Sequence, residues 1–416
     1  MFDDPLLLAR LQFAFTASIH YLFVSLTLGL APFILVGQLR AALRRDPARM
    51  RAVRFWGGLY VVNYGMGVLS GLVMELQLAT NWSGLSDMFG YAFGAPLAVE
   101  TMGAFFVEST FLGLWIFGWD RMGRWAHLAC FAVVTATAYA SAYWVLVANG
   151  FLKNPVGFEI NDGVAELTDP VALAANPSAL LALAHVANTA LIVGSLVVAA
   201  VSAYHLAHRN DPDGMFGRGI RSATSVFAVA VFPAAMSGGF QFSLFGQDPP
   251  TSGLTYTAEE IAAIEGAYEQ AGGIAGGIGV AGEVLMLLSW QLMMVLALVM
   301  VVVRLSRGID RWRWFLWPVV FTPFLPYLAS IGGWVFRETG RQPWAVVHHL
   351  TTADAMTDLT PGMAAVSFSM FTAAFTALAA VTFWLLVRFA RRGPDGGPLA
   401  PAPDPDAAPT PPCHTY

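Results

Sequence analysis

The sequence predicts an all-α, polytopic membrane protein with about nine transmembrane helices, and two observations support this prediction. Of the 416 residues, 56% are hydrophobic and only 12% are charged, a composition typical of a chain that lies mostly within lipid. In addition, nine apolar segments are each long enough to cross a bilayer. They span residues 13–37, 53–79, 92–118, 125–150, 178–205, 220–246, 277–303, 313–336 and 364–388.

The basic residues predict how these spans are oriented. Most of the 22 lysines and arginines lie on one side, in the first, third, fifth and seventh connections and after the ninth span. Because basic residues concentrate in cytoplasmic loops, the N-terminus is expected outside and the C-terminus inside. The acidic start of the chain, at Asp3 and Asp4, indicates that the first span is retained rather than cleaved as a signal peptide. The outer side carries Arg10, Lys153, Arg337 and Arg341.

The chain divides into one large membrane domain and a short tail. Residues 1–392 are expected to form the membrane domain, with two long acidic outer connections at 151–177 and 247–276. The second connection includes TAEEIAAIEGAYEQ, which predicts a short surface helix. The tail at 393–416 is rich in Pro, Ala, Gly and Asp and is expected to be disordered on the cytoplasmic side. The two cysteines provide neither a disulfide framework nor a thiolate metal site, and the lack of a CxxCH motif excludes covalently attached c-type haem.

Two carboxylates stand out in the third span, within GAPLAVETMGAFFVES. Glu100 and Glu108 lie eight residues apart, which in a regular α-helix separates them by about 12 Å along the axis and about 80° around it. A charge held deep in a bilayer costs at least about 2.5–3.5 kcal/mol, and such carboxylates commonly mark proton or ion paths. We therefore predict a functional site here. The alternative is that both are neutral, hydrogen-bonded packing residues.

Several potential metal ligands are expected at one depth near the outer face. His20 and His185 lie inside spans, each roughly 10 Å below the outer end, and Glu100 and Met286 lie at a similar depth. Glu338 closes the eighth span on the same side. His and Met are axial ligands of haem iron, and a His/Met pair makes an electron-transfer centre. Taken singly, each of these residues has an ordinary packing interpretation.

Three other charged residues need partners. Arg341 follows Glu338 closely and can pair with that carboxylate or with an anionic cofactor group such as a propionate. Glu75 and Glu283 are further carboxylates within spans.

Six strings of residues carry a resemblance to a known family. They are RLQFAFTASIH (10–20), TNWS (80–83), GAPLAVE (94–100), FFVESTFLGLWIFGWDRMG (105–123), WVLVANG (144–150) and GRQPWA (340–345). In these strings, and in their order and spacing, the chain resembles subunit I of the cytochrome bd family of terminal oxidases. The strings lie in or next to the first four spans and shortly after the eighth, and the nine-span layout with an outer N-terminus agrees.

The resemblance implies three haems: a low-spin haem b, a high-spin haem b and a haem d, at which O₂ is reduced to water. By the motif match, His20 and Glu338 each resemble the axial ligand of a high-spin haem. His185 and Met286 resemble the pair on the low-spin haem. Which of His20 and Glu338 binds haem d is left open.

The resemblance also implies roles for residues around the haems. Glu100 resembles an acid beside the high-spin pair. Trp334 resembles a residue between the low-spin and high-spin haems. A proton path from the inside is implied for Glu108, Ser109 and Ser141, which makes the reaction electrogenic without proton pumping. Partners of haem propionates or nearby carboxylates are implied for Arg10 and Arg341.

The chain departs from the family pattern in two places. The family's outer loop after the sixth span binds quinol and has the form K-L-A-A-x-E. Here the loop at 247–276 is very short compared with the family's loop and reads EIAAIE from Glu260 to Glu265, so Glu265 keeps the acid and Glu260 replaces the lysine. In addition, Val284 replaces the family's arginine two residues before the ligating Met. We expect quinol as the electron donor, with a different donor as the alternative.

The resemblance implies an assembly in the bacterial cell membrane. The expected partners are cytochrome bd subunit II, sometimes a small single-span subunit, the substrates quinol and O₂, and membrane lipid; no nucleic acid is expected. Two other functions remain as alternatives. One is a haem-binding protein without oxidase activity, such as a sensor or a degenerate partner subunit. The other is a transporter without redox centres that uses a proton relay of Glu75, Glu100, Glu108 and Glu283.

Overall fold

The computed structural model describes residues 4–245, 255–270 and 274–400. Within these residues, nine helical segments are long and apolar enough to cross a membrane, which confirms the predicted all-α fold. Each overlaps one predicted span, and most extend beyond it at both ends. The segments are Pro5–Arg44, Pro47–Asn81, Ser83–Phe117, Arg124–Lys153, Pro170–Ala207, Met215–Phe242, Gly277–Leu305, Arg313–Thr339 and Pro361–Arg392.

Three of these segments are composite, and short elements connect the spans. A turn of π-helix, η1, joins α3 to α4, while α6 precedes α7 and α11 precedes α12. The helices are α1 (Pro5–Arg44), α2 (Pro47–Asn81), α3 (Ser83–Val99), η1 (Glu100–Phe105), α4 (Phe106–Phe117), α5 (Arg124–Lys153), α6 (Pro170–Ala174), α7 (Pro177–Ala207), α8 (Met215–Phe245), α9 (Ala258–Gln270), α10 (Ile274–Leu305), α11 (Arg313–Val320), α12 (Phe324–Thr339), α13 (Thr352–Ala355) and α14 (Pro361–Arg392). The strands are β1 (Phe158–Asn161), β2 (Val164–Leu167), β3 (Trp344–Val346) and β4 (Leu350–Thr351).

Polar caps explain why several helices begin before their apolar segments do. Four long helices each start at a proline that follows a capping residue, and the cap's side-chain oxygen accepts a hydrogen bond from a backbone N–H of the first turn. Proline at this position loses no hydrogen bond, and the cap satisfies an otherwise unpaired donor. The caps are Asp4, Asp46, Asn176 and Thr360.

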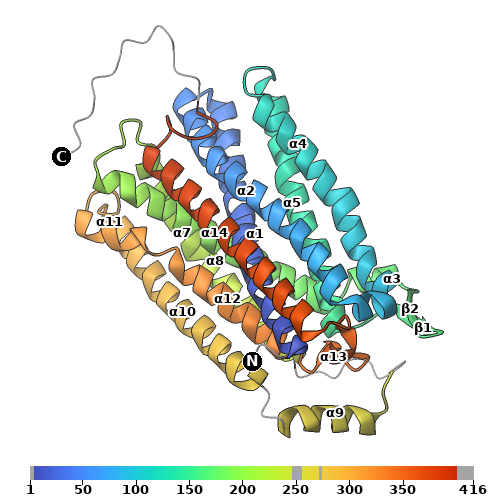
Figure 1. Cartoon of the computed structure of the whole chain (residues 1–416). Helices are drawn as coiled ribbons and strands as arrows, with labels where there is room; N and C mark the ends of the chain where they lie inside the picture. Colours follow the sequence, from blue (N-terminus) through green and yellow to red (C-terminus); the bar gives the residue numbers. More distant parts are fainter. Residues whose placement is uncertain (1–3, 246–254, 271–273, 401–416) are drawn as a thin grey trace.

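The helices run between two chemically different ends of the bundle (Figure 1). One end carries α9 and both pairs of strands, and we call it the α9 end. At the other end α1, α7, α10 and α14 finish and α4 is connected to α5. We call this the arginine-rich end, because it carries Arg44, Arg121, Arg209, Arg307 and Arg392.

The centre of the bundle is formed by α1 and α7, which cross with their backbones in contact. A Cβ added at Gly29 would lie 2.1 Å from the carbonyl oxygen of Ala190, and one added at Gly194 would lie 2.4 Å from the backbone of Gly29. No residue other than glycine fits at this crossing. Small residues at helix crossings let membrane helices approach closely, so packing around this contact positions the side chains that both helices carry.

The connections at the α9 end contain elements that the sequence analysis did not predict. Strands β1 and β2 pair antiparallel across Asp162 and Gly163, which both have positive φ. This is the geometry of a two-residue hairpin loop, and the Asp-Gly dipeptide is its sequence signal. Strands β3 and β4 form a second small antiparallel pair, which begins at the tryptophan of the GRQPW string. The predicted surface helix is confirmed as α9.

The predicted disordered tail starts at residue 393, and its first part contacts the bundle. Asp395 pairs with Arg51 at 3.0 Å, and Pro398 lies against Gly58 of α2. Residues 401–416 lie outside the described residues.

Candidate functional site

His185 on α7 is held so that one ring nitrogen stays open. Its Nδ1 lies 2.8 Å from the carbonyl oxygen of Ala234 on α8, and a carbonyl only accepts, so Nδ1 carries the proton and donates it. The Nε2 lone pair is therefore available. A Cβ at Gly238, one turn further along α8, would lie 3.0 Å from the ring, so bare backbone flanks the imidazole. A second hydrogen bond of this kind is what orients metal-binding histidines.

His20 on α1 is held in the same way. Its Nδ1 lies 2.9 Å from Ser70 Oγ on α2. The Ser70 hydroxyl donates its hydrogen to the carbonyl of Gly67, so its oxygen accepts from the imidazole. Here too the Nε2 lone pair stays open, and Gly71 of α2 flanks the ring.

Two further histidines within the spans, both of them buried, differ from this pair. His127 on α5 bonds Gln38 through Nδ1 at 2.9 Å and the carbonyl of Trp115 through Nε2 at 2.8 Å. His205 on α7 bonds the carbonyl of Ala390 through Nε2 and Asn210 through Nδ1. Because both ring nitrogens are occupied, neither histidine has a lone pair left for a metal.

Met286 on α10 lies at the crossing of α10 with α12. A Cβ at Gly333 would lie 3.1 Å from the Met286 sulfur, and Gly282 and Gly332 bring the two backbones together one turn away. The residue after Gly333 is Trp334, whose ring packs edge-on against Tyr21 at 5.6 Å between centroids. Tyr21 follows His20 in α1, so this contact links the Met286 region to the His20 region.

Glu338 lies at the end of α12 in a polar cluster. Its Oε2 accepts from Arg341 at 2.8 Å and its Oε1 from Asn149 of α5 at 3.1 Å. Arg10 of α1 donates to Gln342 at 2.8 Å. The Nε atoms of both Arg10 and Arg341 are buried and have no hydrogen-bond partner among the described residues. Two unsatisfied guanidinium donors beside one carboxylate leave this cluster short of anionic partners.

Arg337 is a charged residue that the sequence analysis did not assign to the site. It donates to Asn149 at 3.0 Å, to Gln241 at 2.9 Å and to Ser178 at 3.4 Å. Gln241 lies three residues beyond Gly238 on α8, and Ser178 lies two turns before His185 on α7, so the guanidinium sits beside the His185 pocket. All three hydrogen-bonded partners are neutral, so the positive charge is not cancelled by them. Its only signal in the sequence is that a charged residue directly follows the predicted eighth span.

Glu100 is the first residue of the π-turn η1, and this alters its relation to Glu108. The N–H of Phe106 bonds the carbonyl of Thr101, an i→i+5 hydrogen bond. The angle expected for a regular α-helix therefore does not hold. Such single π-turns often occur at functional sites. Ser141 of α5 donates to Glu100 Oε1 at 2.6 Å.

Glu75 on α2 joins the same cluster through Thr101. The Thr101 hydroxyl lies 3.2 Å from Glu100 Oε2 and 3.4 Å from Glu75 Oε1. Glu283, the fourth intramembrane carboxylate, is on α10, which packs mainly against α8 and α12. The structure thus brings Glu75 and Glu100 together and leaves Glu283 apart.

Glu108 lies nearer the arginine-rich end and is 4% exposed. The Tyr60 hydroxyl lies 3.5 Å from its Oε1, and the Tyr64 hydroxyl lies 3.2 Å from Ser109 Oγ. The two tyrosine rings stack at 6.0 Å. A column of hydroxyl and carboxyl groups therefore lies along one side of α4 and η1, although the sequence analysis did not identify the tyrosines.

At the α9 end, Glu265 contacts the last residue of the GRQPW string and the segment that follows it. Trp344 Nε1 donates to its Oε1 at 3.0 Å, and His348 Nε2 lies 3.5 Å from the same oxygen. The Tyr256 ring packs against Trp344 at 5.5 Å. The predicted substrate residue thus contacts the connection that follows α12, which also carries Arg341.

Glu260, which replaces the family's lysine, has a structural partner. Its carboxylate accepts from the N–H and the hydroxyl of Thr257 at 2.8 and 2.9 Å, and its own N–H bonds the Thr257 hydroxyl. This is a capping box at the start of α9. The hydrogen bonds from Thr257 lower the pKa of the Glu260 carboxyl, so the residue supplies a negative charge where the family pattern supplies a positive one.

We expect the α9 end to loosen at mildly acidic pH because of His349. This ring is 3% exposed and bonds Thr255 at 3.1 Å. Burial, and then the charge of His348, lower the pKa of His349 from 6.5 to about 4. The unfolded state therefore binds a proton between pH 6.5 and 4 that the folded state excludes, and stability is lost as the pH falls through this window. The free energy of opening this end of the protein should be about 2 kcal/mol lower at pH 5 than at pH 7.

Hydrogen exchange at β3, β4 and α9, corrected for intrinsic rates, measures this effect. His349→Gln should abolish the pH dependence, while His208→Gln, at the arginine-rich end, should leave it intact. Equal protection at pH 7 and pH 5 in the unchanged protein would contradict the prediction.

The residues present fit haem groups. Two imidazoles have open Nε2 atoms, a thioether lies against bare glycine backbone, and two buried guanidinium Nε atoms lack partners in the described part of the chain. His and Met are the ligands that haem iron takes in electron-transfer centres, and arginine pairs with carboxylates such as propionates. No group of three or more His, Cys, Asp or Glu suited to a bare metal ion occurs among the described residues.

Comparisons with known proteins point to one family. The sequence model of the family described as "Cytochrome bd terminal oxidase subunit I" matches residues 8–279 and 280–394. The chain is 30% identical over 442 residues to "Cytochrome bd ubiquinol oxidase subunit 1" of Bacillus subtilis (strain 168), covering 94% of each chain. It is 30% identical over 499 residues to "Cytochrome bd-II ubiquinol oxidase subunit 1" of Escherichia coli (strain K12), covering 94% of this chain and 97% of that one.

A solved structure shows the same fold. A chain of the bd oxidase from Geobacillus thermodenitrificans superposes with a TM-score of 0.75 at 22% identity, covering 94% of this chain and 99% of that chain.

Proposed function

The chain belongs to the family of cytochrome bd terminal oxidase subunit I, and from this premise we propose that it carries the haems of an oxidase that reduces O₂ to water with electrons from quinol. It is a multi-pass protein of the bacterial cell membrane, and the family implies a partner subunit II. A small single-span subunit remains a prediction.

One observation carries the proposal: His20 and His185 keep Nε2 open, whereas His127 and His205 use both ring nitrogens. We assign His185 and Met286 to a low-spin haem b, and His20 and Glu338 to a high-spin haem b and a haem d. The bound haems supply electron transfer and the O₂-binding iron. Arg10 and Arg341 offer their buried Nε donors to propionates, and Trp334 lies between the Met286 and His20 regions.

The protons are proposed to come from the arginine-rich end, which the positive-inside rule assigns to the cytoplasm. Glu108 lies nearer that end, and Glu100 nearer the α9 end. Ser109, Tyr60 and Tyr64 surround the first carboxylate, and Ser141 and Thr101 bond the second. Protons that move from Glu108 toward Glu100 meet electrons that arrive from the outer side, so the reaction generates a potential without a pump.

Quinol is proposed to bind near Glu265, where Trp344 and His348 line the contact between α9 and the β3–β4 pair. Glu260 favours a second candidate, a different electron donor, because its negative charge stands where the family pattern has a lysine. Exchanging a cation for a carboxylate changes which donors can bind.

A reduced-minus-oxidised spectrum of the purified complex, followed by quinol-driven O₂ uptake on the same sample, tests the proposal. Bands of low-spin haem b and haem d with brisk uptake are expected, and Glu265→Ala should raise the KM for quinol while leaving uptake from an artificial donor unchanged. The same bands with uptake only from an artificial donor would establish the second candidate. A spectrum without haem bands would exclude the oxidase.

We further expect Arg337→Gln to lower the midpoint potential of the low-spin haem. The guanidinium beside His185 has only neutral hydrogen-bond partners, and a fixed positive charge favours the reduced form. The expected shift is on the order of tens of millivolts, since about 59 mV corresponds to a tenfold change in the equilibrium constant of a one-electron reduction. Arg337→Lys should retain most of the potential in a spectroelectrochemical titration. An unchanged potential in the glutamine variant would rule out this role.

A further inference from the structure

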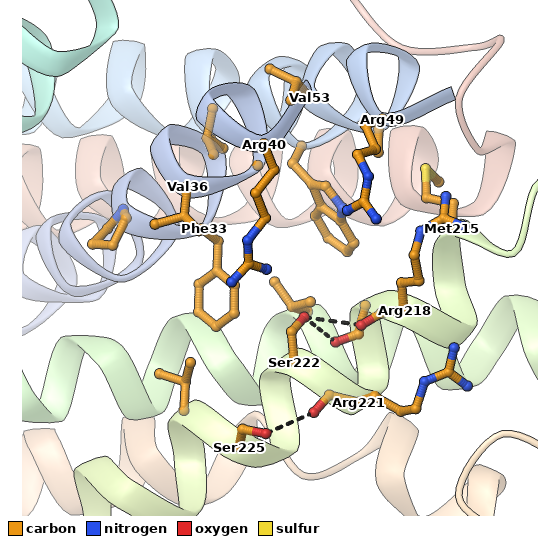
Figure 2. Close-up of a pocket in the computed structure, with 18 of the residues that line it drawn as sticks. Phe33, Val36, Arg40, Arg49, Val53, Met215, Arg218, Arg221, Ser222 and Ser225 are labelled. Carbon is orange, nitrogen blue, oxygen red and sulfur yellow. Dashed lines mark hydrogen bonds between the residues drawn. The ribbon is translucent and has the colours of Figure 1, made fainter. Parts of the chain in front are cut away.

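A groove at the arginine-rich end lies outside the site described above. It has a volume of about 590 Å³ and opens between the α1–α2 pair and α8. Figure 2 shows Arg40 and Arg49 reaching from α1 and α2 toward α8, which contributes Arg218. Two further arginines line it, and its deeper wall is apolar. The two further arginines are Arg221 and Arg304, and the apolar wall includes Phe33, Leu191 and Val198.

Two of the five arginines are paired with carboxylates. Arg49 Nε lies 3.0 Å from Asp46, although this nitrogen makes no well-aligned hydrogen bond to a described residue. Arg221 forms an ion pair with Asp310. These pairs cancel two of the five positive charges.

The other three arginines form no close ion pair with a carboxylate among the described residues, although Arg218 also interacts electrostatically with Asp46. Arg218 donates to the backbone carbonyl of Asp213 at 2.9 Å, and Arg304 to the carbonyl of Arg221 at 2.6 Å. Arg40 is exposed and makes no hydrogen bond or ion pair to another described residue. The groove therefore holds an excess of positive charge, with guanidinium groups whose paired N–H donors match phosphate oxygens.

An exposed apolar stripe continues from the groove along α8. Ser222, Ser225 and Val226 line the groove. The same helical face, at steps of three or four residues, then carries side chains that are 56–71% exposed: Val229, Phe232, Met236 and Phe240. From Val229 to Phe240 the stripe is about 16 Å long, which is about half of the ~30 Å hydrocarbon thickness of a bilayer. Its length matches one leaflet.

We propose that this groove binds an anionic glycerophospholipid of the cytoplasmic leaflet. The phosphate is held among Arg40, Arg49 and Arg218, and the acyl chains lie along the α8 stripe. Charge complementarity alone would suit any phosphate, but the apolar stripe that begins where the arginines end suits a molecule with a headgroup and chains. Basic pockets between membrane helices on the cytoplasmic side bind such headgroups. The inference does not depend on the redox function.

The test uses the whole purified complex, delipidated in a neutral detergent. Dioleoyl-phosphatidylglycerol should remain bound in native mass spectrometry and raise the Tm, while dioleoyl-phosphatidylcholine should do so much more weakly. In Arg40→Gln/Arg218→Gln the affinity for phosphatidylglycerol should fall about thirtyfold, the value for two basic contacts near a membrane surface. Arg40→Gln alone, at an exposed side chain, should lower it about fivefold and keeps the test valid if the double variant misfolds.

The matched control is Arg44→Gln/Arg391→Gln. It removes the same charge from two exposed arginines at the same end that do not line the groove, and it should bind phosphatidylglycerol normally. The proposal would be overturned if phosphatidylcholine bound as tightly as phosphatidylglycerol, or if inorganic phosphate competed as well as the lipid. It would also be overturned if the control variant lost as much affinity as Arg40→Gln/Arg218→Gln. Unchanged binding in the Arg40→Gln variants would overturn it too, and is the result expected if subunit II fills the groove.

Discussion

His185→Ala is expected to remove the low-spin haem absorbance from the purified complex and to leave the high-spin bands largely intact. Alanine has no lone pair to replace Nε2, and the hydrogen bond to Ala234 that orients the ring is lost with it. The proposed high-spin ligands, His20 and Glu338, lie on other helices, α1 and α12, so their haems should be retained. The reduced-minus-oxidised spectrum measures both effects on one sample.

His205→Ala is the matched control for this variant. His205 is buried on the same helix, but both of its ring nitrogens are hydrogen-bonded, so its loss should not remove a haem band. The retained high-spin bands report that the His185 variant is folded. Unchanged low-spin absorbance in His185→Ala would end the assignment of this residue.

Glu108→Gln is expected to slow O₂ uptake at least about tenfold while the haem spectrum stays unchanged. Glutamine keeps the size of the side chain and can still bond Tyr60, but it cannot accept and release a proton. A positioned proton-transfer group commonly contributes 10²–10⁴-fold to a rate, so a loss of this order identifies the carboxyl as part of the path. Uptake with an artificial reductant, which bypasses the quinol step, measures the effect directly.

Glu283→Gln is the corresponding control. This carboxylate is also within a span, but α10 places it away from Glu75, Glu100 and Glu108, so uptake should remain near the unchanged level. A relay that used all four carboxylates, as in the transporter alternative, would lose function in both variants. Normal uptake in Glu108→Gln would exclude the proposed path.

The transporter alternative is weakened by the arrangement of the buried histidines. A proton relay does not require imidazoles with one nitrogen open, nor a thioether packed against bare glycine, yet the chain positions His20, His185 and Met286 in this way. The proposed haem ligation accounts for all three.

Much of the fold could be predicted because it depends on local properties. A span needs about 20 apolar residues, and caps such as Asp4 and Asp46 are adjacent to the helices they begin. The small strand pairs were missed because strands of only a few residues have a weak pattern, although Asp162-Gly163 is a turn signal. The π-turn at Glu100 was also missed, since its i→i+5 bond depends on how α3 and α4 pack.

By itself, then, the sequence determined the nine spans, their charge asymmetry and the types of side chain available as ligands, because these follow from composition and short-range spacing. Only the tertiary structure decided which histidines keep a nitrogen open, that Arg337 lies beside His185, and that Glu265 contacts Trp344. Each of these depends on hydrogen bonds between residues far apart in the chain, such as Arg337 with Asn149 and Ser178. In an interior without water, a polar group must find its partner on a neighbouring helix, and packing selects that neighbour.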